Sequence, residues 1–201
     1  MARSSFSQHK LFENCKRCWF HKYVLKKKPE QETHYLDAGS LIHDCLENYY
    51  NGEMEEVEEI KKWFNKEWER YDLKNTPLKD DKDAYWIMVL NGINLGITAT
   101  SAELKIWYPD SVCYIDLVDS ENDIIIDWKS SKRKGYSEDR YKKQILFYCW
   151  LYLRKMGRLP KEGRVYYLRY TGTKGVLKVK PTMEKIKEVK QWYQNLLKEM
   201  A

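Results

Sequence analysis

A carboxylate and an ammonium group, those of Asp127 and Lys129, end a run of three isoleucines in the segment IIIDWK. Side chains alternate between the two faces of a strand, so a strand over 123–129 places both charged groups on one face. Asp116 interrupts another apolar segment, 112–118, and only a short SEN turn separates the two segments. The segments are therefore expected to pair as antiparallel neighbours, which brings the carboxylates of Asp116 and Asp127 close together.

Two neighbouring carboxylates repel each other unless a positive charge lies between them. The ammonium group of Lys129 is one candidate for that charge. A divalent cation is the other, because Mg²⁺ and Mn²⁺ prefer carboxylate oxygens. The alternative without a function is a buried Asp–Lys ion pair, which is uncommon because desolvation offsets much of the attraction. The three residues alone leave both interpretations open.

Three further polar side chains have the spacing to reach the same place. His43 follows Gly39 by four residues and precedes Glu47 by four, so a helix would turn the imidazole inward with Glu47 as its hydrogen-bond acceptor. Gln144 and Tyr148 are also four residues apart and share one helix face. Each has a structural alternative, since a histidine on a half-buried helix is more often packed than a ligand, and the Gln–Tyr pair suits the polar edge of an aromatic helix.

The elements that must position these groups follow from hydrophobic periodicity and turn residues. Helices are expected over 5–24, 39–50, 54–71, 82–98 and 137–156, and from a capping threonine at 182 to about 198. Strands are expected over 102–108, 112–118, 123–129, 164–170 and 175–180. No linker divides the chain, so we expect one α/β domain over 1–201, with a mainly helical part (1–98) that carries the histidine and a sheet core (99–201) that carries the acids and the lysine.

Composition narrows the class of protein. The chain has 201 residues, 43% of them hydrophobic, and a formal net charge of +6, which suits a globular protein with a polyanionic partner. It has no run of 18 apolar residues, so no membrane span is expected, and its N-terminus lacks the apolar region of a secretory signal. Five cysteines, an odd number, predict free thiols and a cytoplasmic location.

Four short motifs occur in a fixed order: GSLIH, CYID, IIIDWK and QILFY. This order resembles the PD-(D/E)XK nuclease superfamily, and specifically its RecB-like branch, which includes CRISPR-associated RecB-type exonucleases and small stand-alone phage exonucleases. The resemblance extends from about residue 5 to about residue 170. It implies a restriction-endonuclease-like core, a mixed central sheet with flanking helices, preceded by an N-terminal helical region.

The resemblance also implies roles for individual residues. His43, Asp116, Asp127 and the backbone carbonyl of Trp128 are implied ligands of Mg²⁺ or Mn²⁺, and Lys129 is the implied catalytic lysine. The helix motif of Gln144 and Tyr148 is implied to position that lysine or the DNA strand. Glu103 stands where many relatives have an acidic residue one strand earlier, which makes it a further candidate ligand.

The cysteines depart from the family pattern. Cys113 occupies the position that is usually glycine in the second motif. Some relatives hold an iron–sulfur cluster through one N-terminal and three C-terminal cysteines, but no cysteine follows Cys149, so no cluster is expected here. Cys15, Cys18 and His21 have metal-like spacing, yet a zinc site needs a fourth ligand and a helix would spread these three around its axis. We expect packed thiols instead.

Basic and aromatic residues follow the Asp-x-Lys strand directly. The residues of this set are Lys132, Arg133, Lys134, Tyr136, Tyr141 and Lys142. They are expected to contact phosphates and to stack on bases, and the alternative is a solvated charged loop. The leading hypothesis is a Mg²⁺- or Mn²⁺-dependent DNA exonuclease that acts on single strands or ends in recombination, repair or phage DNA processing, with recombination or replication proteins as partners. Alternatives are a flap endonuclease, an RNA-directed nuclease and a non-catalytic DNA-binding protein of the same fold. Cleavage polarity and oligomeric state stay open.

Overall fold

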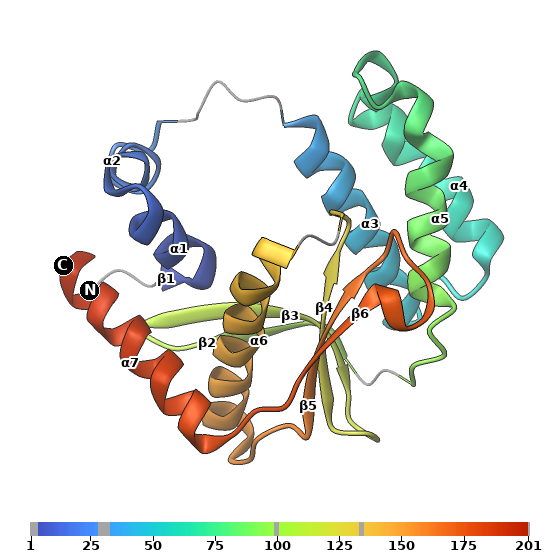
Figure 1. Ribbon diagram of the computed structural model, residues 1–201. Helices are drawn as coiled ribbons and strands as arrows, with labels where there is room; N and C mark the ends of the chain where they lie inside the picture. Colours follow the sequence, from blue (N-terminus) through green and yellow to red (C-terminus); the bar gives the residue numbers. More distant parts are fainter. Residues whose placement is uncertain (1–3, 28–32, 99–100, 133–134, 201) are drawn as a thin grey trace.

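The computed structural model describes residues 4–27, 33–98, 101–132 and 135–200 (Figure 1). The strands are β1 (Ser4–Ser5), β2 (Ser101–Trp107), β3 (Ser111–Asp119), β4 (Ile124–Lys129), β5 (Glu162–Tyr167) and β6 (Val176–Val179). The α-helices are α1 (Phe6–Asn14), α2 (Lys16–Trp19), α3 (His34–Tyr50), α4 (Val57–Arg70), α5 (Lys82–Ile93), α6 (Gly135–Met156) and α7 (Met183–Met200). A π-helical turn (Phe20–Val24) follows α2, and 3-10 turns cover Leu73–Asn75, Lys79–Asp81 and Gly172–Gly175.

A six-stranded mixed sheet forms the centre of the fold, in the order β1-β3-β4-β5-β6, with β2 paired to β3. β2, β3 and β4 are consecutive antiparallel strands, as predicted. β5 runs parallel to β4, because α6 carries the chain back across the sheet. The predicted α/β class, with a mixed sheet and a helical N-terminal region, is confirmed.

Helices cover both faces of the sheet (Figure 1). Ile126 and Trp128, on one face of β4, pack in a core with residues of α3, α4 and α5. Ile125, on the other face, packs in a second core with residues of α6 and α7. Because side chains alternate, Asp127 and Lys129 lie on the α6 side. No helix within the described ranges is long and apolar enough to cross a membrane.

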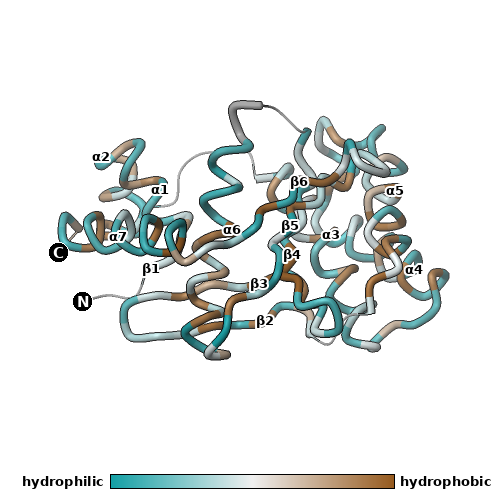
Figure 2. Tube along the Cα trace, turned by 60° about the horizontal axis from the view of Figure 1, so that its bottom comes forward, coloured by the Kyte–Doolittle hydropathy of each residue, from teal (hydrophilic) through white to brown (hydrophobic). Residues whose placement is uncertain are grey.

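The two halves of α6 differ in polarity. Figure 2 shows a hydrophilic stretch before the middle of the helix and more apolar later turns. Ile145 and Leu151 are fully buried, whereas Asp139 and Arg140 are exposed. The helix therefore packs on the sheet through its second half, and its polar first half is free to line a site near the end of β4.

The N-terminal region differs from the predicted helix over 5–24. Cys15 is extended (φ −157°) and ends α1, and its thiol is joined to Cys18 in a disulfide across the first turn of α2. The prediction that these were free, packed thiols is therefore wrong, because the break brings their Cα atoms to 5.3 Å, within bonding range. Cys45, Cys113 and Cys149 are free and buried. The helix expected from residue 39 begins five residues earlier, at His34.

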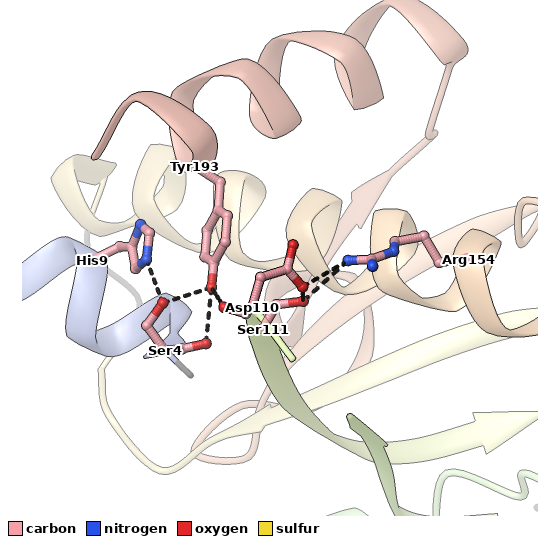
Figure 3. A network of polar contacts seen from close by, with 6 residues as sticks. All are labelled: Ser4, His9, Asp110, Ser111, Arg154 and Tyr193. Atoms are coloured by element: carbon pink, nitrogen blue, oxygen red, sulfur yellow. Dashed lines mark hydrogen bonds and ion pairs between the residues drawn. The ribbon is translucent and has the colours of Figure 1, made fainter. Parts of the chain in front are cut away.

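A buried polar network ties the N-terminus to the last helix (Figure 3). The Tyr193 hydroxyl lies 2.7 Å from Ser4 Oγ, 2.9 Å from the Ser4 carbonyl and 3.0 Å from the Asp110 carbonyl. Ser4 Oγ also lies 2.7 Å from Nε2 of His9, whose ring stacks on Tyr193 at 3.8 Å. The network holds β1 against the start of β3, where Ser4 pairs with Ser111.

His9 is expected to make the stability of the protein fall in mild acid. Burial lowers the pKa of His9 from 6.5 to about 4. Between these pH values the unfolded chain binds a proton that the folded chain does not. The contribution of His9 to the free energy of unfolding is therefore fully present above pH 6.5 and is lost as pH falls. We expect this residue alone to remove about 2 kcal/mol between pH 7.5 and pH 5.

Urea unfolding of the wild type and of His9→Phe measures this effect, because phenylalanine keeps a stacking ring but does not titrate. The difference in free energy of unfolding between the two proteins should shift in favour of the variant at pH 5. An unchanged difference at both pH values would contradict the assignment.

Candidate active site

The site begins where two strands of the sheet diverge. β3 and β4 pair only through Leu117–Ile126, Val118–Ile125 and Asp119–Ile124. β1 pairs with β3 farther back, at Ser111 and Val112, and β2 occupies the other edge of β3. Among the described strands, residues 113–116 of β3 thus have no partner on the β4 edge, and Asp116 stands at the opening.

Asp116 occupies the place of the missing backbone pairing. Continuing the register would pair Trp128 with Ile115, but the Trp128 N–H donates instead to Asp116 Oδ2 at 2.5 Å. Since the N–H and C=O of a strand residue point to the same neighbour, the Trp128 carbonyl also points toward the opening. Asp116 Oδ1 lies 3.5 Å from Nδ1 of His43 on α3. The acceptor expected for this imidazole was Glu47, and the structure places Asp116 at Nδ1 instead.

A second group of side chains surrounds Asp127. Its Oδ2 lies 2.5 Å from Nζ of Lys129, and its Oδ1 accepts a hydrogen bond of 3.3 Å from the Gln144 amide. The same amide nitrogen donates to the Tyr148 hydroxyl at 2.7 Å. Alternation on β4 and the four-residue spacing on α6 therefore bring all four side chains together, as the sequence predicted.

Three of the side chains predicted as metal ligands lie close enough together to hold one ion. Ligand atoms of His43, Glu103 and Asp116 lie within 4.8 Å of one another, and Asp127 is not in this set. Ala102 pairs with Leu117, and Leu104 pairs with Ile115. Glu103 lies between the two β2 residues and Asp116 between the two β3 residues, so the two carboxylates face each other across β2 and β3. The two carboxylates suit Mn²⁺ or Mg²⁺.

Glu103 has a left-handed backbone conformation, with φ at +48°. A residue with a side chain adopts this region at a cost of about 1–3 kcal/mol when the surrounding structure holds it there. Like charges directly opposite on neighbouring strands also destabilise a sheet. The chain thus keeps an unfavourable arrangement at the point where a cation would neutralise it.

The charges of the site are unbalanced without such a cation. Burial, and then repulsion from Asp116, raises the pKa of Glu103 to about 7. Burial is also the main reason that the pKa of Asp127 is raised to about 6, although Lys129 opposes the shift. Burial alone would raise the pKa of Asp116, but His43, Lys129 and the Trp128 N–H together outweigh it and lower that pKa. Asp116 is therefore the carboxylate that holds its charge most firmly.

The basic partners respond in the opposite direction. Burial by itself would lower the pKa of Lys129, but attraction by Asp127 and Asp116 outweighs it and raises the pKa, so the amine stays charged. The pKa of His43 is raised for the same reason, since Asp116 outweighs burial. Burial raises the pKa of Tyr148 well above its ordinary value, which keeps the phenol protonated as a donor.

A cavity of about 380 Å³ gives access to these groups. Asp116 and Asp127 line it together with the lysine, the histidine and the Gln–Tyr pair, and Ser5, Phe6 and Ser7 contribute from the N-terminal segment. Sequence patterns do not predict this wall, because the two-residue strand β1 has no periodicity and reaches the site only by pairing with β3. Tyr114 of the same cavity was also missed.

The predicted basic and aromatic cluster is only partly described. Lys132 is exposed, Lys129 Nζ lies 5.1 Å from the centre of the Tyr141 ring, and Lys142 pairs with Asp139 at 3.1 Å. Arg133, Lys134 and the side chain of Tyr136 lie outside the described residues.

Comparison with known proteins identifies a related family and a related fold. Residues 3–201 match the family model of the PD-(D/E)XK nuclease superfamily. A crystal structure of a protein from Eubacterium rectale, described as a candidate exonuclease, superimposes with a TM-score of 0.58 at 12% sequence identity, covering 99% of this chain and 82% of that one. At this identity the likeness shows a shared fold. The chain matches no curated protein sequence.

Proposed function

Because the chain belongs to the PD-(D/E)XK nuclease superfamily, we propose that it is a Mg²⁺- or Mn²⁺-dependent deoxyribonuclease that degrades single-stranded DNA or DNA ends. The observation that carries the proposal is the meeting of His43, Glu103 and Asp116 beside the Lys129–Asp127 pair, at the opening between β3 and β4. The proposal includes two further predictions, which are membership of the RecB-like branch and a role in recombination, repair or phage DNA processing.

The proposed ligands are His43, Glu103 and Asp116, with Asp127 and the Trp128 carbonyl beside them. When bound, the cation supplies charge neutralisation of the phosphate and a bound water of lowered pKa. A phosphodiester otherwise resists attack because its negative charge repels the nucleophile.

The protein's own groups would complete the reaction. Lys129 stays charged, so it can hydrogen-bond the attacking water and offset negative charge in the transition state. Asp127 holds that amine at 2.5 Å, and Gln144 holds Asp127. Tyr148, as a protonated phenol beside Gln144, can donate to a phosphate oxygen.

The substrate contacts proposed outside the centre come from Lys132, Arg133, Lys134, Tyr136, Tyr141 and Lys142. Support comes from the position of Tyr141, whose ring lies next to the Lys129 amine, and from the hydrophilic stretch of α6 before its middle (Figure 2). A cytoplasmic location is part of the proposal. The free thiols of Cys45, Cys113 and Cys149 support it, whereas the disulfide between Cys15 and Cys18 does not. Recombination or replication proteins are the proposed partners.

Digestion of end-labelled DNA tests the proposal. Strands labelled at the 5′ or 3′ end, single and double, are incubated with Mg²⁺, Mn²⁺ or EDTA, beside a closed circular single strand. We expect metal-dependent loss of the linear single strands and survival of the circle. Cleavage of the circle would show that the enzyme is an endonuclease and not an exonuclease. No cleavage with either ion, while DNA is still bound, would favour a non-catalytic DNA-binding protein.

A further inference from the structure

A second cavity adjoins the proposed centre on the α3 side. It measures about 480 Å³, within the range of small-ligand pockets. His43 lines both this cavity and the first one, and Glu103 lines this one as well, so two of the three proposed ligands border it. The remaining lining comes from α3, between Tyr35 and Glu47, and from Ser130, the residue after the proposed catalytic lysine.

The chemistry of the cavity wall disfavours a phosphate. Asp44 and Glu47 add two carboxylates to Glu103, and no lysine or arginine is among the described residues that line the cavity. A DNA strand that places its phosphate at the cation must therefore place a neutral part here. Carboxylates accept hydrogen bonds from the amino groups of bases, so a base fits this wall.

The rim of the cavity offers a stacking surface. Tyr35 is 58% exposed and Leu36 is 70% exposed, although both are large apolar side chains in the first turn of α3. The Tyr35 ring lies 4.4 Å from the His34 ring, which restricts its orientation. Aromatic faces of this kind stack on unpaired bases irrespective of sequence.

Close packing fixes the distance from this rim to the reacting groups. A methyl group added at Gly39 would lie 3.4 Å from Ser130 Oγ, so α3 and the end of β4 are in direct contact there. Tyr35 and His43 belong to the same helix, four residues before and after Gly39. A base held by Tyr35 would thus be held relative to Lys129.

We propose that this cavity receives the unpaired base of the nucleotide next to the cleaved phosphate, with Tyr35 as a positioning residue that stacks on that base. The inference rests on the proposed nuclease function and adds a reason for a single-strand preference, because a paired base cannot enter. Leu36 covers the edge of the base, and Asp44 or Glu47 accepts from its amino group.

Substrates that lack one base test the inference in a double-mutant cycle. The substrates are single strands with one abasic nucleotide, whose position is moved stepwise along the sequence. Each is cleaved by the wild type, Tyr35→Ala and Tyr35→Phe. The control is Trp107→Ala, which removes an exposed aromatic side chain outside both cavities. We expect Tyr35→Ala to lower kcat/KM about tenfold on intact strands and to have no further effect when the base is missing at one position. Tyr35→Phe and the control should behave as the wild type.

If Tyr35→Ala lowers kcat/KM by the same factor on every abasic strand as on the intact strand, the tyrosine does not act through a base. That result would overturn the inference and leave the nuclease function standing. Fluorescence gives a readout that does not need cleavage. A strand carrying 2-aminopurine is bound to Lys129→Met, and quenching should disappear when Tyr35→Ala is added and persist with Tyr35→Phe. If the wild type cleaves nothing, the proposed function fails, and Tyr35-dependent quenching alone decides whether the base site exists. Equal quenching with and without the tyrosine ring would overturn it.

Discussion

Replacing Lys129 with methionine is expected to reduce metal-dependent cleavage by at least about 10³-fold, while the protein still folds. Loss of a single group that stabilises transition-state charge typically costs 10²–10³ in rate, and here the positioning of Asp127 is lost as well. Methionine fills most of the volume of the lysine stem, so the cavity cost is small. Initial rates on a labelled single strand measure the effect, and more than a tenth of wild-type activity in the variant would contradict the proposed role.

Stability distinguishes a catalytic effect from misfolding. Without the lysine, Asp127 is a buried carboxylate with no partner cation, a situation that costs about 3–5 kcal/mol while the charge remains. The pKa of Asp127 is already about 6, so in the variant a proton replaces the lost cation at lower pH. Lys129→Met should therefore be destabilised at pH 8 but close to the wild type near pH 5. The double variant with Asp127→Asn should recover stability at pH 8 and stay inactive.

The sequence predicted the parts of the site that local patterns determine. Asp116, Asp127 and Lys129 lie on two strands joined by a four-residue turn, so alternation and a short connection suffice to bring them together. Gln144 and Tyr148 share a helix face for an equally local reason. The order of four motifs then placed the chain in its superfamily, which the family comparison confirms.

Non-local packing determines the parts that the sequence did not predict. Glu103 was a candidate ligand only through the family resemblance. Its place opposite Asp116 depends on the register in which β2 pairs along β3, and no motif encodes that register. The wall of Ser5 and Ser7 depends on a two-residue strand held by Tyr193, about 190 positions away. The disulfide between Cys15 and Cys18 depends on a helix break that hydrophobic periodicity does not show.

Replacing Glu103 with glutamine is expected to stabilise the metal-free protein at pH 8 and to abolish its response to metal. In the wild type the carboxylate is partly buried opposite Asp116, and its pKa is raised to about 7. The folded chain therefore takes up a proton that the unfolded chain does not between pH 7 and pH 4.5, so the contribution of this group is fully present below pH 4.5 and is lost as pH rises through 7. Glutamine removes the ionisation, and we expect a gain of about 1–2 kcal/mol at pH 8, after allowance for solvent screening, and none at pH 4.5.

The same substitution removes one of three proposed ligands, so stability and function should move in opposite directions. Urea unfolding in EDTA at pH 8 should favour Glu103→Gln, whereas Mn²⁺ should stabilise only the wild type, because a ligand stabilises the state that binds it. Glu121→Gln, which changes an exposed residue in the turn between β3 and β4, should match the wild type in both measurements. If Glu103→Gln is less stable than the wild type in EDTA, or gains as much from Mn²⁺, the carboxylate belongs to the scaffold. The expected result would instead show that the unfavourable pairing of Glu103 with Asp116 is kept for the cation that relieves it.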